Sequence, residues 1–225
     1  MTSLPERVVL IDDPHVDWAD AMEFRLTYRG PLLTATSDRK RQAGRANHKQ
    51  NIRQALHPQL RRCWEVMPQL NGKTWSAPVL GIGGGPVAHD VPTLAARFAI
   101  GNYNIVPMLT RDLFAVCGLD VLLLRPDGSD RVGYSGDIDN QLKTLIDGLQ
   151  APRETGQFGD YQSPRDGETP FFCLLQDDSL ITRLSVQTDR LLTPPSGPES
   201  SDDVLAIITV KLTSDAFDTG LRHTN

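Results

Sequence analysis

The sequence predicts an α+β fold in which a mixed β-sheet packs against helices in a single domain. Strand-like segments are separated by polar stretches rich in Gly and Pro, and residues 138–149 place apolar side chains at helical spacing. Hydrophobic residues make up 39% of the 225 residues, which is enough for a buried core. We found no internal repeat or heptad array, which would have indicated a solenoid or a coiled coil.

The first expected strand covers residues 22–28, where apolar side chains occupy every second position and Gly30-Pro31 follows. A basic loop comes next. A helix is then expected from about Asn47 to Trp64, because its apolar residues recur at spacings of three and four. Pro58 should kink or split this helix, since proline lacks an N–H and clashes with the preceding turn.

Two segments, 66–93 and 150–170, are rich in polar residues, Gly and Pro and are interpreted as insertions into the domain. The glycine run at 81–85 lacks the following Lys and Ser/Thr of a phosphate-binding loop, so that interpretation is rejected. Residues 1–20 are interpreted as an irregular lead-in, 21–215 as the domain and 216–225 as a tail.

Residues 117–124 form a nearly continuous apolar run, which is typical of a strand in the middle of a sheet. The clearest helix is 138–149, with an apolar face that is expected to pack on the sheet. Further strands are expected at 96–106, 171–175, 183–188 and 204–212.

Composition excludes several classes of protein. The three cysteines, Cys63, Cys117 and Cys173, are odd in number and far apart, which argues against a disulfide framework or a zinc ribbon. The N-terminus lacks a signal-peptide core, and the longest aliphatic run, 121–124, is too short to span a bilayer. We therefore expect a soluble cytoplasmic protein.

The net charge of −5 is unusual for a protein that binds nucleic acid, but basic residues are concentrated at 38–62. This segment suits contact with a polyanion and suits equally a solvated helix face. His48 and His57 fall on opposite faces of the expected helix and are interpreted as polar groups on its basic surface. The candidate nucleic-acid-binding residues are Arg39, Lys40, Arg41, Arg45, Lys49 and Arg53.

Acidic side chains cluster at the start of the helix 138–149. Asp137 and Asp139 are two residues apart there, Lys143 follows one helical turn later, and a second acidic pair stands at Asp177-Asp178. Mg²⁺ prefers carboxylate oxygens, water and substrate phosphates as ligands. The pattern therefore indicates a divalent-metal site, although a calcium-stabilised loop or a phosphohydrolase also fits, and Asp139 is equally suited to be the N-cap of the helix.

The segment 136–149, GDIDNQLKTLIDGL, resembles the D-x-D-N-x-x-K-x-x-x-D-x-L hallmark of the RusA-type Holliday-junction resolvases, and LQDDSLI at 175–181 resembles the D-D turn of that family. The resemblance implies a RusA-like fold with Mg²⁺, or Mn²⁺ in its place, bound by Asp137, Asp139 and Asp178. Asp177 is the less favoured neighbour, and Lys143 is the catalytic lysine. The four residues Asp137, Asp139, Lys143 and Asp178 form the implied catalytic set.

By this resemblance the chain is expected to be a Mg²⁺-dependent endonuclease that cuts branched DNA, acts as a homodimer and binds any protein partner through its insertions. Two alternatives remain open: a non-catalytic DNA-binding or complex-forming subunit that keeps the fold, and a metal-dependent phosphohydrolase acting on small nucleotides. A serine hydrolase is excluded, because Asp137 occupies the last position of the G-x-S-x-G pattern at 133–137.

Overall fold

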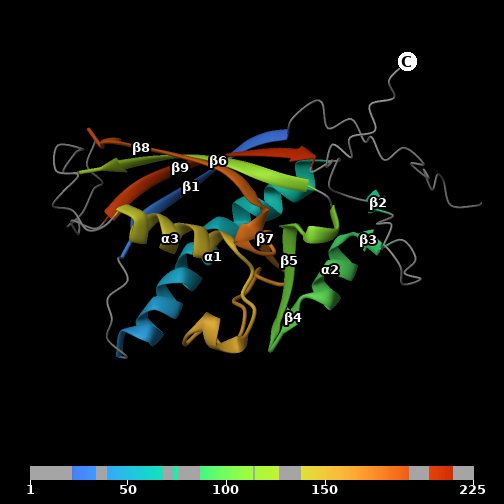
Figure 1. The fold of residues 1–225 in the computed structure, drawn as a ribbon. Helices are drawn as coiled ribbons and strands as arrows, with labels where there is room; N and C mark the ends of the chain where they lie inside the picture. Colours follow the sequence, from blue (N-terminus) through green and yellow to red (C-terminus); the bar gives the residue numbers. More distant parts are fainter. Residues whose placement is uncertain are drawn as a thin grey trace, which may run out of the picture.

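The computed structural model describes residues 22–33, 40–67, 73–75, 87–113, 115–126, 138–192 and 203–214. They form the predicted mixed α+β fold (Figure 1). Its main sheet has four strands in the order β1-β9-β6-β8. Neighbouring strands are antiparallel, except that β6 and β8 are parallel. The strands are β1 (Met22–Pro31), β9 (Asp203–Ser214), β6 (Ala115–Arg125) and β8 (Ile181–Arg190).

A smaller sheet has the order β4-β5-β7, with β5 and β7 parallel, and β2 pairs with β3 separately. Helices α1 and α3 lie together on one side of the main sheet, and α2 packs beside β5 (Figure 1). The bounds of these elements are α1 (Lys40–Val66), β2 (Lys73–Trp75), β3 (Val87–His89), α2 (Val91–Arg97), β4 (Ala99–Ile100), β5 (Tyr103–Leu109), α3 (Ile138–Leu149) and β7 (Phe171–Leu175). Three short 3₁₀ turns complete the fold: η1 (Arg111–Leu113), η3 (Thr155–Phe158) and η4 (Asp178–Leu180).

Strand β6 lies inside the main sheet, as its apolar run predicted. Leu119, Val121 and Leu123 are buried on the face that meets the helices, whereas the alternate residues are half-buried on the other face. The expected strands at 22–28, 171–175, 183–188 and 204–212 are also present, each within a strand of the structure.

Helix α1 begins at Lys40, so residues 40–46, expected to belong to the basic loop, are helical. Pro58 lies within α1 and does not split it. Its side chain is exposed, so water can bind the carbonyl that its missing N–H leaves free. The next residue, Gln59, covers the outer edge of β1 at Thr27: its side-chain amide accepts from Thr27 N at 2.9 Å and donates to Thr27 O at 2.7 Å.

The expected strand at 96–106 is wrong in its first half, where α2 and the short strand β4 precede β5. The side chain of Asp90 caps α2 by accepting from Thr93 N at 2.8 Å, and a proline occupies the first turn. Gly101, with φ of 58°, then turns the chain between β4 and β5.

Residues 150–170, expected to be an insertion, are packed against α1. Asn47 donates to the Asp160 carboxylate at 2.6 Å and accepts from its backbone N–H at 2.7 Å, and the Tyr161 hydroxyl donates to Asn51 at 2.6 Å. Phe158 stacks on Tyr103 with ring centroids 4.1 Å apart. This segment is therefore an integral part of the packed domain.

The three cysteines are free and buried, in agreement with the sequence. Helices that combine the length and the apolar character needed to cross a membrane are absent from the described ranges.

Candidate functional site

The position of α3 is fixed by its contact with α1. Leu145 and Leu149 are buried there, and Gly148 allows the close approach, because a Cβ at this position would stand 2.5 Å from Ile52 Cγ2. The rest of the expected apolar face, including Leu142 and Ile146, is only half-buried. One flank of the apolar face is therefore partly accessible, although Leu142 still packs against the edge of the core.

Asp139 and Lys143 project from the first two turns of α3, and both are exposed. Because the helix begins at Ile138, Asp139 is its second residue and not its N-cap, and its structural role is limited to the helix dipole in the first turn. Asp137 lies outside the described residues.

The two neighbouring aspartates after β7 have different environments. Asp177 is 4% exposed; its Oδ1 accepts from Ser179 N at 3.0 Å and also from the Ser179 hydroxyl, and its Oδ2 pairs with Arg111 at 2.9 Å. Burial alone would raise the pKa of this carboxyl, but the bonds from Ser179 and Arg111 outweigh burial and lower it. Oδ1 thus caps η4 while Oδ2 pairs with Arg111, so both oxygens of Asp177 are engaged within the protein. This arrangement favours Asp178 over Asp177 as a metal ligand.

Asp178, in contrast, is exposed and lines a cavity of about 570 Å³ together with Asp139 and Lys143. α3 forms one wall of this cavity, and η4 with the start of β8 forms the other. Among the side chains that the structure describes, none forms an ion pair with Asp139, Lys143 or Asp178. The fold thus brings together the three described members of the implied catalytic set.

The same cavity has an aliphatic side. Leu142 and Ile146 of α3 face it with Ile181 and Leu184 of β8, and Leu184 is 41% exposed. Polar groups and aliphatic surface therefore adjoin within one site.

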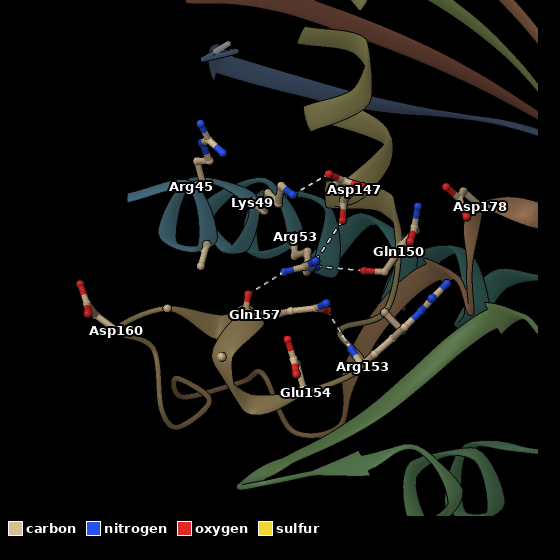
Figure 2. A pocket seen from close by; sticks show the side chains of 14 residues that line it. Arg45, Lys49, Arg53, Asp147, Gln150, Arg153, Glu154, Gln157, Asp160 and Asp178 are labelled. Carbon is tan, nitrogen blue, oxygen red and sulfur yellow. Dashed lines mark hydrogen bonds and ion pairs between the residues drawn. The ribbon is translucent and has the colours of Figure 1, made fainter. Parts of the chain in front are cut away.

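A second cavity, of about 800 Å³, lies between α1 and residues 150–160 (Figure 2). Asp147 and Asp178 line both cavities, so the two are contiguous. Lys49 of α1 reaches across to Asp147 of α3 and pairs with it at 2.6 Å. Asp147 is therefore neutralised by the protein itself.

Arg53 forms the floor of the second cavity and is 4% exposed. Its guanidinium donates to the backbone carbonyls of Gln150, Asp147 and Gln157 at 2.9, 3.0 and 3.2 Å (Figure 2). With its donors used in this way, Arg53 holds the 150–157 segment and α3 on α1, and its interpretation as a nucleic-acid-binding residue is wrong.

The remaining basic candidates are placed unevenly. Arg45 and Lys49 line the second cavity. Lys40 and Arg41 belong to the first turn of α1, but their side chains lie outside the described part, as does Arg39 altogether.

The two histidines of α1 are buried and not on a basic surface. His57 Nδ1 accepts from Phe172 N at 2.9 Å, so Nε2 carries the proton and donates to Gly167 O at 3.2 Å. His48 Nε2 accepts from Leu33 N at 3.3 Å. Burial lowers the pKa of both imidazoles, which makes them neutral structural groups.

Within the described residues, no three His, Cys, Asp or Glu side chains are arranged so that they could hold a metal ion together. Asp139 and Asp178 offer two exposed carboxylates. Mg²⁺ is commonly bound by one or two carboxylates, with water and substrate phosphates completing the octahedron. The available donors thus fit a magnesium ion that is shared with a phosphate substrate, and they do not fit zinc, which prefers His and Cys.

Sequence reasoning did not identify Arg111, Ser179, Gln150 or Arg153 as residues around the site. A serine two residues after Asp177 is a recognisable capping signal, and it favours Asp177 as the structural member of the pair. The other contacts join positions far apart along the chain, so no local pattern marks them.

Comparisons of the chain with models of protein families, with curated proteins and with solved structures found no match. The function is therefore argued from the site.

Proposed function

We propose that this chain is a Mg²⁺-dependent endonuclease that hydrolyses phosphodiester bonds in branched DNA, as its resemblance to RusA-type resolvases implies. The observation that carries the proposal is the cavity shared by Asp139, Lys143 and Asp178, three exposed polar side chains from two distant segments. Their exposure leaves them accessible to a substrate that approaches from the surface.

Asp139 and Asp178 would hold the metal, with Asp137 adjoining in sequence. Bound Mg²⁺ polarises a phosphate oxygen and lowers the pKa of a bound water. Lys143 supplies a positive charge beside the two carboxylates, where it offsets the negative charge that develops on the phosphate during attack. Asp147 contributes differently: its pairing with Lys49 fixes the C-terminal half of α3 on α1 and so orients the cavity wall.

A four-way junction presents two equivalent strands for cutting, so the proposal includes a homodimer with one site per subunit. The acidic net charge is compatible with this proposal, because local donors and a bound cation, and not the net charge, determine contact with phosphate.

The test is cleavage of labelled four-way junctions, forks, flaps and linear duplexes in Mg²⁺, Mn²⁺ or EDTA. Asp139→Asn should abolish metal-dependent cleavage, because the carboxylate that would bind the metal loses its charge. Binding of the junction in Ca²⁺ should be preserved, because helix α3 remains folded. Asp166→Asn is the matched control, since Asp166 is exposed and lines a separate cavity.

Full activity of Asp139→Asn would refute the proposed site. Junction binding without cleavage in any metal would favour a non-catalytic subunit. Hydrolysis of free nucleotides without DNA cleavage would favour a phosphohydrolase.

A further inference from the structure

The second cavity contains hydrogen-bond donors that the protein does not use. Gln150 Nε2 is buried and has no partner within the described residues. In Figure 2 its amide lies between Asp147 and Asp178, the two residues that line both cavities. A buried donor without an acceptor costs about 1–3 kcal/mol, so a ligand oxygen that accepted from this amide would gain from the bond.

Several acceptors around this cavity are already engaged by the protein, including two of its four acidic side chains. Asp147 pairs with Lys49 at 2.6 Å, Asp160 accepts from Asn47 at 2.6 Å, and Gln157 Oε1 accepts from Arg153 N at 2.8 Å. The Arg153 guanidinium, in contrast, has no ion-pair partner among the described side chains. Asp178 belongs to the metal-binding pair proposed above, so the unused groups of this cavity are the Gln150 amide, the Arg153 guanidinium and the carboxylate of Glu154. Donors are in excess among them, which suits an oxygen-rich anion.

The net charge of the cavity does not indicate whether it binds an anion or a cation, because four basic and four acidic side chains line it. The hydrogen-bond donors do indicate an anion: they are Gln150 Nε2, the ammonium of Lys49 and the guanidinium of Arg153. A phosphate group has several acceptor oxygens that match such donors, and arginine forks bind phosphate in bidentate fashion.

We propose that this second cavity binds a phosphate of the DNA strand next to the one that is cut, with Gln150, Lys49 and Arg153 as its donors. The inference rests on the proposed function, since the first cavity would hold the scissile phosphate. Contiguity of the two cavities gives the strand a continuous path from α3 to the 150–157 segment. The volume of about 800 Å³ leaves room for a nucleotide unit of that strand.

Two variants test the subsite. Gln150→Met removes the amide with little change in side-chain size, and Arg153→Gln removes the guanidinium charge. Gln150→Met should bind DNA about tenfold more weakly in Ca²⁺, and it should raise the thermal midpoint of the ligand-free protein because it eliminates an unpaired buried donor. A purely structural glutamine would not give this combination. Arg62→Gln, an exposed arginine of α1 that lines a different cavity, is the matched control.

The strand is located by replacing one phosphodiester at a time with an uncharged methylphosphonate. Wild type should lose about tenfold in affinity at one linkage adjacent to the cut, and the double variant Gln150→Met/Arg153→Gln should be insensitive at that linkage. Inorganic phosphate should also raise the thermal midpoint of wild type more than that of the double variant.

The outcomes separate the two proposals. Normal cleavage with unchanged DNA affinity and unchanged methylphosphonate sensitivity in both variants would overturn the subsite and leave the endonuclease standing. A phosphate-dependent thermal shift without any DNA binding would assign the cavity to a free phosphate compound and overturn its role in holding a strand.

Discussion

Polar side chains are found both in the interface of α1 with residues 150–168 and in the cavity between α3 and β8, but they differ in burial and in hydrogen bonding. In the interface, Arg53 and His57 are buried and hydrogen-bonded to the backbone. In the cavity, Asp139, Lys143 and Asp178 are exposed and have no ion-pair partner in the described part of the chain. The comparison teaches that the polar groups of the interface are engaged in holding the fold together, whereas those of the cavity remain available to a ligand.

The largest effect is expected from Arg53→Met, which removes the donor to three carbonyls. Leaving these acceptors without a donor should lower the free energy of unfolding by about 3–5 kcal/mol. Urea denaturation measures the change, with Arg62→Met as control for an exposed arginine of the same helix. A loss below about 1 kcal/mol would contradict the structural role of Arg53.

The next effect concerns catalysis and not stability. Lys143→Ala should reduce the rate of DNA cleavage by about 10²–10³-fold, because the charge that stabilises the attacked phosphate is lost. Lys143→Arg should restore little of the rate, since the guanidinium places its charge differently. Single-turnover cleavage and urea denaturation are measured on the same preparations. Cleavage within a few-fold of wild type would make Lys143 a surface residue of the proposed site.

Asp177 should behave like the structural residues Arg53 and His57, although it is next to Asp178 of the cavity. Its pKa is lowered in the folded protein, so the stability it contributes is present above its usual pKa of 3.8 and is lost as the pH falls toward the folded value. Asp177→Asn should cost about 1–3 kcal/mol at pH 7 and flatten the dependence of stability on pH between about 5 and 3. The measurement is the urea midpoint of the wild type and the variant across this pH range. If the two show the same loss of stability toward low pH, the Arg111 contact does not stabilise the fold.

The smallest effect is expected for the stability of the cavity variants. Asp139→Asn and Asp178→Asn should each change the free energy of unfolding by less than about 1 kcal/mol, because exposed carboxylates in a first turn gain only a modest dipole interaction. Loss of more than that, by urea denaturation, would place these aspartates with the structural group and remove the contrast between the two regions.

The sequence predicted some elements of the fold correctly and missed others. The apolar run of β6 and the periodicity of α3 identified these elements correctly, because a strand inside a sheet and an apolar helical stripe each leave a local pattern. Helix α2 was missed although Asp90 and Pro92 mark its start, because a short amphipathic turn followed by apolar residues resembles a strand.

The site was predicted as a set of residue types and not as an arrangement. Asp139, Lys143 and Asp178 were identified from their motifs, and the structure places them around one cavity. The roles of Arg53 and of Asp177 depend on carbonyls and a guanidinium contributed from elsewhere in the chain. Basic composition alone cannot distinguish an arginine that binds phosphate from one that ties two segments together.

The side chain of Gln59 has a consequence for assembly. It occupies both the N–H and the C=O of Thr27 and so obstructs the outer edge of β1 at one position, whereas no strand among the described residues pairs with the outer edge of β8. A strand added beside β1 would have to displace Gln59. Two molecules joined along β8 would carry this obstruction at both outer edges, so further addition of strands would be disfavoured beyond two copies.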